Sequence, residues 1–176
     1  DKRFRYHWGI DGFSTLRALL QNIQAGEVVS GASTITMQVI RLSRRGKQRT
    51  ISEKLIEMLL ATRLEFSYSK TEILEMYASH APFGGNVVGI DAASWRYFGT
   101  GPENLSWAQA TTLAVLPNSP SLIHPGKNRD ALKEKRNKLL KRMYDKGIID
   151  KETYELSIDE DIPLLNKKFP DIAHHL

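Results

Sequence analysis

Residues 31–42, GASTITMQVIRL, decide the fold of this chain, because they place a run of small hydroxylated residues directly before an amphipathic helical pattern. Serine and threonine favour the start of a helix, where a side-chain oxygen accepts hydrogen bonds from amides that lack a partner. We therefore predict a helix over residues 33–43 that begins through Ser33 and Thr34. The same hydroxyl groups, with Gln38 one turn later, would also line a polar site. The stretch alone leaves both interpretations open.

Helical signals continue on both sides of this stretch. Leu16, Leu20 and Ile23 recur at helical spacing before Gly26, which predicts a helix over residues 12–25. Capping-box patterns, in which Ser or Thr precedes Glu or Gln by three positions, mark the starts of further helices. Alternation with a period of two is scarce. The predicted fold class is therefore all-α, and the later helices cover residues 51–66, 69–79, 88–97, 106–116, 130–146 and 150–157.

Turn signals suggest how the chain is divided. PFGGN at 82–86 predicts a turn, and PNSPSLIHPGKN at 117–128 predicts a proline-rich loop. We expect a core over residues 1–125, and C-terminal helices with a linker over residues 126–176.

Composition is that of a soluble globular protein: 176 residues, 41% hydrophobic and 26% charged. Such a length fits one domain with a small accessory lobe. No apolar run approaches the roughly 18–20 residues that a membrane span needs. The absence of cysteine excludes disulfides and cysteine-ligated metals. The chain opens in mid-pattern at DKRFRYHWGID, so we expect a segment upstream of it.

The net charge of +5 indicates an anionic partner. Charge alone does not distinguish between nucleic acid, acidic lipid and a phosphorylated substrate. Residues 41–49, RLSRRGKQR, carry five cations and no acid. This stretch is either a solvated loop or a binding surface, and we expect poor order around Gly46. No recognised nucleic-acid-binding motif is present, so we expect no nucleic-acid partner.

Two further patterns carry possible chemistry. Lys54 and Glu57 are three residues apart and share one helix face, either as a surface ion pair or as part of a site. Glu53 and Glu57 are like charges four residues apart, which disfavours the helix unless a cation or a ligand relieves them. His7 is either a structural histidine or a member of a site.

Four ordered motifs and two later stretches resemble the peptidoglycan glycosyltransferases of bacteria (glycosyltransferase family 51), as found in class A penicillin-binding proteins. The resemblance spans nearly the whole chain and is greatest to their C subtype. The second family motif is matched by GASTITMQ, with Met37 in place of a glutamine. The third is matched by EKLIE, with Glu53 where arginine is usual, and the fourth by ILEMYASHAPFGG. GIDAASWRYFG and LSWAQATTLAVLPNSPS resemble the closing helices. The first motif is matched by Asp1, Phe4, His7, Gly9 and Asp11.

The resemblance implies a lysozyme-like helical fold with a small membrane-facing lobe. It also implies polymerisation of lipid II into glycan strands, with inversion at the anomeric carbon, on the outer (periplasmic) face of the bacterial cytoplasmic membrane. The implied partners are lipid II, the growing strand, the membrane surface and other proteins of cell-wall synthesis. The transpeptidase motifs of such proteins are missing from this sequence, and their membrane anchor would lie outside it.

The resemblance also assigns roles to residues. Lys54 would stabilise the leaving pyrophosphate, Glu57 would be the second acid of the site, and Asp1 would belong to the catalytic group. No metal site is certain, although Mg²⁺ or another divalent cation is plausible at the pyrophosphate. The expected substrate-binding residues are His7, Ser33, Thr34, Thr36, Gln38, Arg41 and Arg49. The expected structural supports are Phe4, Gly9, Asp11, Glu75 and Tyr77.

The family's general base is a glutamate immediately before the position of Asp1. A chain that starts at Asp1 is therefore expected to bind substrate with little turnover, unless that glutamate precedes it in the parent protein. This leaves two other function classes open. One is a non-catalytic module that binds lipid II or glycan, and the other is a lysozyme-like enzyme that cleaves glycan.

Overall fold

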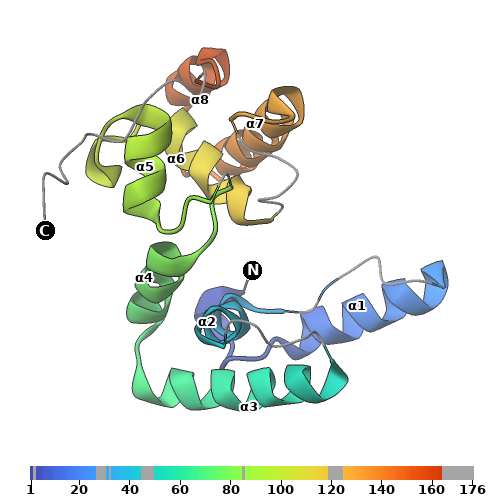
Figure 1. Ribbon diagram of the computed structural model, residues 1–176. Coiled ribbons are helices and arrows are strands. Elements are labelled where there is room, and N and C mark those ends of the chain that lie inside the picture. The colour runs from blue at the N-terminus through green and yellow to red at the C-terminus, as the bar shows by residue number, and fades with distance from the viewer. Residues whose placement is uncertain are drawn as a thin grey trace, which may run out of the picture. The chain divides into compact units, whose positions relative to one another are not determined.

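The computed structural model describes residues 1, 3–26, 31, 33–44, 50–84, 86–118 and 125–163. This described part is helical and holds no β-strand, which confirms the all-α prediction (Figure 1). None of its helices is long and apolar enough to cross a membrane. The α-helices are α1 (Gly12–Ala25), α2 (Ile35–Ser43), α3 (Ile51–Ser67), α4 (Lys70–His80), α5 (Ile90–Phe98), α6 (Trp107–Val115), α7 (Arg129–Asp145) and α8 (Lys151–Asp159), and the 3-10 turns are η1 (Phe4–Tyr6), η2 (Pro102–Asn104) and η3 (Leu116–Asn118).

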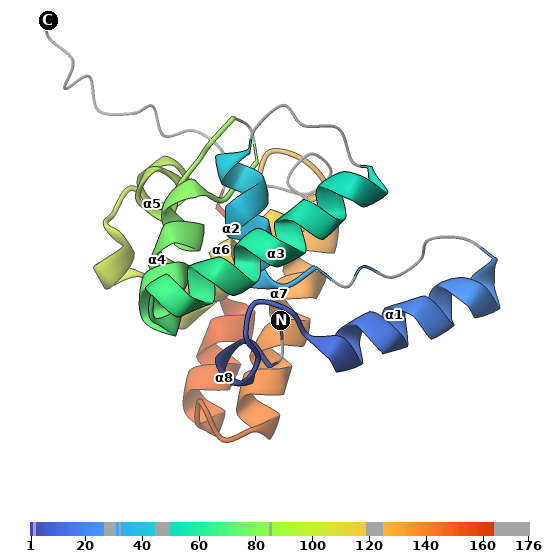
Figure 2. The same cartoon turned by 90° about the horizontal axis from the view of Figure 1, so that it is seen from below.

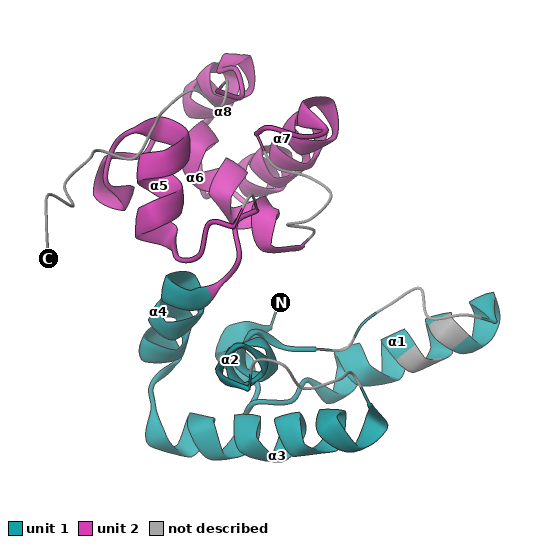
Figure 3. Ribbon diagram, viewed as in Figure 1, with its two compact units in different colours: residues 1–80 teal, residues 81–176 magenta. Residues whose placement is uncertain are grey.

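The chain forms two compact units, residues Asp1–His80 and Ala81–Leu176 (Figure 3). Unit 1 contains α1 to α4 and the residues of the first four motifs, apart from the APFGG turn that closes the fourth; the two closing stretches lie in unit 2. The expected division at residues 125 and 126 does not coincide with the limit between these units. As a statement about domains, it stays a prediction.

The helices begin where hydroxyl and carboxyl groups cap them. The Thr34 hydroxyl accepts from the amide of Met37 at 3.1 Å, so α2 begins as the sequence predicts. The Ser69 pattern forms both halves of its capping box, whereas Thr50 caps α3 alone. The side chain of Glu53, the expected partner of Thr50, instead binds Arg44.

Unit 1 is built around α2, which packs against α3 and α4 (Figures 1 and 2). Met37 and Ile40 of α2 are buried against Ala61 of α3. Burying one side chain of this size contributes about 1.5–3 kcal/mol. Because Ala61 has only a methyl side chain, neighbouring segments can approach the α3 backbone closely at this position. The core of unit 1 therefore fixes the hydroxyl-rich start of α2 relative to α3.

Helix α1 has the predicted bounds, and Gly26 ends it in the left-handed conformation. Its apolar residues are nevertheless exposed: Phe13, Leu16, Leu20 and Ile23 share one side of the helix at spacings of three and four. Unit 1 thus presents an uncovered apolar helix face.

In unit 2, α6 packs against α7 and α7 against α8. Leu113 of α6 is buried with Leu132 and Leu140 of α7. Arg136 is also buried, and its guanidinium donates to the carbonyls of Ile158 and Glu160 at the end of α8. These bonds satisfy the last carbonyls of that helix.

Candidate functional site

The first motif folds into a tight turn against α2 and α3. Phe4 is buried, and Gly9 has a φ of 77°. The Thr34 hydroxyl donates to the Gly9 carbonyl at 2.6 Å. A Cβ atom at Gly9 would lie 2.7 Å from the carbonyl carbon of Ala61 and from the amide nitrogen of Thr62. Glycine is required here both by its φ and by the closeness of the α3 backbone.

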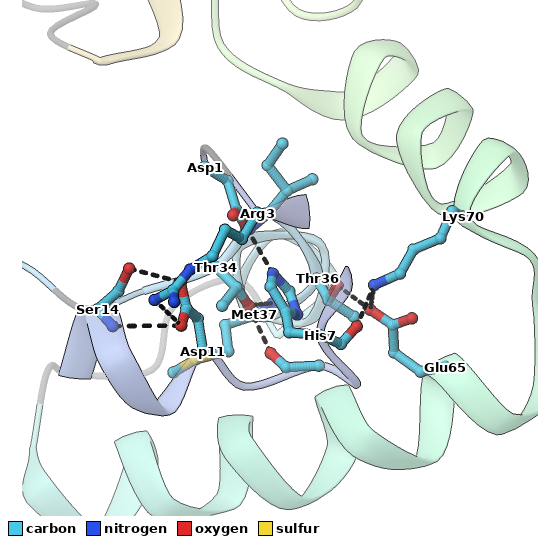
Figure 4. A network of polar contacts seen from close by, with 12 residues as sticks. Asp1, Arg3, His7, Asp11, Ser14, Thr34, Thr36, Met37, Glu65 and Lys70 are labelled. Carbon is cyan, nitrogen blue, oxygen red and sulfur yellow. Dashed lines mark hydrogen bonds and ion pairs between the residues drawn. The ribbon is translucent and has the colours of Figure 1, made fainter. Parts of the chain in front are cut away.

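Asp1 and His7 form a buried pair beside the first turn of α2. The Asp1 Oδ2 atom lies 3.0 Å from His7 Nε2 and 3.1 Å from the amide nitrogen of Ile35 (Figure 4). Their side chains are 5% and 8% exposed. Burial, and next the charge of Lys70, lower the pKa of His7, so the imidazole is neutral at neutral pH. A carboxylate only accepts hydrogen bonds, so the proton of this imidazole is on Nε2.

Asp11 is fixed at the start of α1. It accepts from the Ser14 hydroxyl at 2.6 Å, from the Ser14 amide at 3.2 Å, and from the Arg3 guanidinium at 2.5 and 3.1 Å. The Ser14 hydroxyl does most to lower the pKa of Asp11, to about 2, and Arg3 adds to the effect. Asp11 is therefore a paired anion that caps the N-terminus of α1.

Part of the first motif, the start of α1 and the hydroxyl-rich turn line one pocket of about 360 Å³ in unit 1. It contains two guanidinium groups, hydroxyl groups and the Asp1 carboxylate, and so offers donors to an oxygen-rich anion. Arg17 belongs to this lining and was missed by the sequence analysis, although it follows Asp11 and Ser14 at spacings of three on one helix face. The lining residues are Asp1, Arg3, Asp11, Ser14, Arg17, Gly31, Ser33 and Thr34.

Arg41 connects the hydroxyl-rich turn to α3. Its guanidinium makes two hydrogen bonds to Glu57, at 2.7 and 2.5 Å, and one to the Ser33 hydroxyl at 3.4 Å. The side chain of Glu57 is only 7% exposed, and its hydrogen bonds raise the pKa of Arg41. Ser33, Arg41 and Glu57 are thus brought together, although of these three only Ser33 lines the pocket.

Lys54 is placed differently from its predicted partner Glu57. Its side chain is exposed and has no hydrogen bond or ion pair with the residues that the structure describes. Glu57 pairs with Arg41 instead, and Glu53 pairs with Arg44 at 2.7 and 2.5 Å. The two like charges of α3 are therefore relieved by Arg41 of α2 and by Arg44 at its C-terminal end.

The other expected site residues are spread around α2. The Gln38 side-chain oxygen accepts from the Tyr77 hydroxyl at 3.4 Å, and burial raises the pKa of Tyr77. Glu75 is exposed on α4, away from these contacts. Arg49 and the basic stretch around Gly46 lie outside the described residues.

Thr36 is buried and faces a carboxylate that the sequence analysis missed. Its hydroxyl donates at 2.6 Å to Glu65, which also accepts from Lys70 at 2.7 Å. A signal was present in the sequence, because Glu57, Ala61 and Glu65 recur every four residues on one face of α3. With a small residue between them, that face fits closely against another helix.

The described carboxylates of unit 1 do not gather into a group that would hold a metal ion. Within the described ranges, no group of three or more histidine or acidic side chains is arranged to hold a cation. Asp11, Glu53, Glu57 and Glu65 each pair with an arginine or a lysine, and Asp1 pairs with His7. A divalent cation at the pyrophosphate stays a prediction, and none enters the chemistry below.

The fold resembles that of a known solved structure. The crystal structure of penicillin-binding protein 1A from Haemophilus influenzae matches with a TM-score of 0.53 and 27% sequence identity, over 77% of this chain and 17% of that chain. An all-α, lysozyme-like transglycosylase domain is the class that this fold and the polar site define.

Comparison of sequences gives the family. The transglycosylase family model matches residues 1–144. The chain is 42% identical over 173 residues to penicillin-binding protein 1C of Escherichia coli K12, covering 98% of this chain and 22% of that protein. It is 36% identical over 168 residues to penicillin-binding protein 1A of Aquifex aeolicus VF5, covering 96% and 23%. The chain belongs to the transglycosylase family, and it spans about a fifth of the length of these relatives.

Proposed function

We propose that this domain is a peptidoglycan glycosyltransferase that polymerises lipid II into glycan strands with inversion at the anomeric carbon. The observation that carries the proposal is the convergence of three distant stretches in unit 1. The Asp1 carboxylate binds the Ile35 amide, Thr34 binds the Gly9 carbonyl, and Arg41 joins Ser33 to Glu57. Hydroxyl and guanidinium donors then face one pocket that suits a sugar joined to a diphosphate.

The chemistry assigns different tasks to these groups. A sugar hydroxyl is a weak nucleophile, so a carboxylate must accept its proton on one face of the donor sugar. In an inverting reaction the leaving group departs from the opposite face. The leaving pyrophosphate gains negative charge, which cations stabilise. Lys54 has an exposed ammonium for this task, and Arg41 is held ready by Glu57.

The apolar face of α1 supports a membrane surface as the place of action. Phe13, Leu16, Leu20 and Ile23 are exposed on a helix that contains Arg17 and no acidic residue. A helix of this kind can bury its apolar face in the interfacial region of an anionic membrane. The outer face of the cytoplasmic membrane, where lipid II would be presented, is the proposed location. We also propose other cell-wall synthesis proteins as partners, because the chain resembles class A penicillin-binding proteins.

The test is a polymerisation assay with fluorescent lipid II in detergent micelles, using this chain extended upstream by the glutamate of the family motif. Gel separation of the strands measures turnover, and fluorescence anisotropy measures lipid II binding. Glu57→Gln is expected to reduce turnover about 100-fold. The substitution removes the charged partner of Arg41 and one acidic group of the site. Glu134→Gln, on an exposed position of α7, is the matched control.

The outcomes separate the candidate functions. Turnover by the parent chain, lost in Glu57→Gln and kept in Glu134→Gln, supports the glycosyltransferase. Binding of lipid II without turnover would support the non-catalytic module. Glu53 favours that module, because an acid paired with Arg44 stands where the family usually has an arginine. Shortening of preformed strands would indicate the glycan-cleaving alternative.

A further inference from the structure

A partly buried ion pair, Lys70 with Glu65, lies on the opposite side of His7 from Asp11 and Ser14 (Figure 4). Lys70 Nζ donates to Glu65 Oε1 at 2.7 Å and to the main-chain carbonyl of His7 at 2.5 Å. The Glu65 side chain is 4% exposed. The roles assigned above for substrate, proton and leaving group do not use either residue.

The pair connects four segments of unit 1. The same Glu65 oxygen that accepts from Lys70 also accepts from the Thr36 hydroxyl in the first turn of α2. The Lys70 ammonium lies 4.7 Å from the centre of the Phe4 ring. The first-motif turn, α2, the end of α3 and the start of α4 therefore meet at two side chains.

Burial of an ion pair is a weak source of stability, since the lost hydration offsets most of the attraction. The Glu65–Lys70 pair is better explained as a device that fixes the geometry of the segments around it. His7 is held at its carbonyl by Lys70 and at its ring by Asp1, and Asp1 in turn accepts from the Ile35 amide. Thr36, the neighbour of Ile35, is held by Glu65.

We propose that Glu65 and Lys70 are positioning residues that hold the His7–Asp1 pair in register with the first turn of α2, and so keep the Asp1 carboxylate in place at the substrate pocket. This role deepens, and rests on, the proposed glycosyltransferase function. Neither residue touches the reacting atoms. They act through the main chain of His7 and through Thr36.

The charges around His7 provide a signature of this contact. The groups that face it are Asp1, Arg3, Asp11, Glu65 and Lys70. After burial, Lys70 does most to lower the pKa of His7, while Glu65 raises it. Removing Lys70 should therefore raise the pKa of His7, and removing the charge of Glu65 should lower it further.

The experiment compares Lys70→Met and Glu65→Gln with the parent chain, which carries the upstream glutamate. Lys70→Arg is the conservative variant, and Lys141→Met is the matched control, because Lys141 is an exposed lysine of unit 2 that pairs with Asp145. Three quantities are measured: the pKa of His7 by NMR titration, hydrogen exchange of the Ile35 amide, and kcat and KM for lipid II. Circular dichroism establishes that each variant is folded.

We expect Lys70→Met to raise the pKa of His7, to speed exchange at Ile35 and to lower kcat about 10- to 100-fold with little change in KM. Glu65→Gln should lower the pKa of His7 and reduce kcat as well, and Lys70→Arg should recover part of the loss. The proposal is overturned if folded Lys70→Met leaves the pKa of His7 and the Ile35 exchange equal to those of Lys141→Met, whatever its turnover.

Failure of the proposed function is recognised separately. If the parent chain makes no polymer, the glycosyltransferase proposal fails. The titration of His7 and the exchange at Ile35 still decide whether Glu65 and Lys70 position this pair.

Discussion

The contact of Gly9 with the backbone of α3 allows a prediction of stability with a worked magnitude. Gly9 has a φ of 77°, a conformation that costs an alanine about 1–2 kcal/mol. Its new Cβ would also lie 2.7 Å from two backbone atoms of α3. Backbone cannot rotate away as a side chain can, so overpacking adds about 1–3 kcal/mol. Gly9→Ala should therefore destabilise unit 1 by about 2–5 kcal/mol.

Two other glycines separate these causes. Gly26 also has a positive φ, of 68°, but a Cβ there meets no atom within 4 Å. Gly26→Ala should cost only the conformational part, about 1–2 kcal/mol. A Cβ at Gly12 likewise meets nothing within 4 Å, and that residue has no positive φ. Gly12→Ala should stabilise by about 0.4–1 kcal/mol, because it restricts the unfolded chain.

Urea unfolding followed by circular dichroism gives the free energy of unfolding of each variant. Native-state hydrogen exchange of amides in α2 and α3 assigns the loss to unit 1, since two units need not unfold together. If Gly9→Ala proves no more destabilising than Gly26→Ala, the close approach of the first motif to α3 is wrong.

Two further predictions concern buried charges. Asp11→Asn should destabilise the protein at pH 7 by about 1–2 kcal/mol, a figure reduced for the partly exposed Arg3. Folding lowers the pKa of Asp11 from 3.8 to about 2, so the Asp11 carboxylate stabilises the fold fully at pH values above 3.8. This stabilisation disappears as the pH falls through 2. At that pH the parent protein and Asp11→Asn should unfold at the same urea concentration. Arg136→Met should destabilise unit 2 by about 2–4 kcal/mol, because it leaves the last carbonyls of α8 without hydrogen-bond donors. Faster hydrogen exchange confined to α7 and α8 would support this prediction. Faster exchange of amides in α2 would contradict it.

Much of the fold could be predicted because its signals are local. The helix starts at Thr34, Thr50, Ser69 and Ser106 depend on side chains within three residues of the amides that they cap, and the structure confirms each one. Short-range spacing does not show what covers a helix. The apolar face of α1 has the pattern of a core helix, yet it is exposed.

The candidate site was less accessible to sequence reasoning. The motif residues were found by resemblance, but their partners depend on which helices pack together. Glu57 was expected beside Lys54 because both lie on α3, whereas the packing of α2 on α3 gives it Arg41. Lys70 carries no local signal for its contact with His7, because that contact joins positions 63 residues apart in the chain.

The central claim is that the first motif, the hydroxyl-rich turn and the Lys54–Glu57 face bind one sugar–diphosphate. NMR titration of the chain with a disaccharide diphosphate carrying a shortened prenyl chain tests it most directly. The resonances of the Ile35 amide, the Arg41 side chain and the Lys54 ammonium should shift along a single saturation curve. Shifts confined to one of the three stretches, or curves with different midpoints, would contradict a shared site.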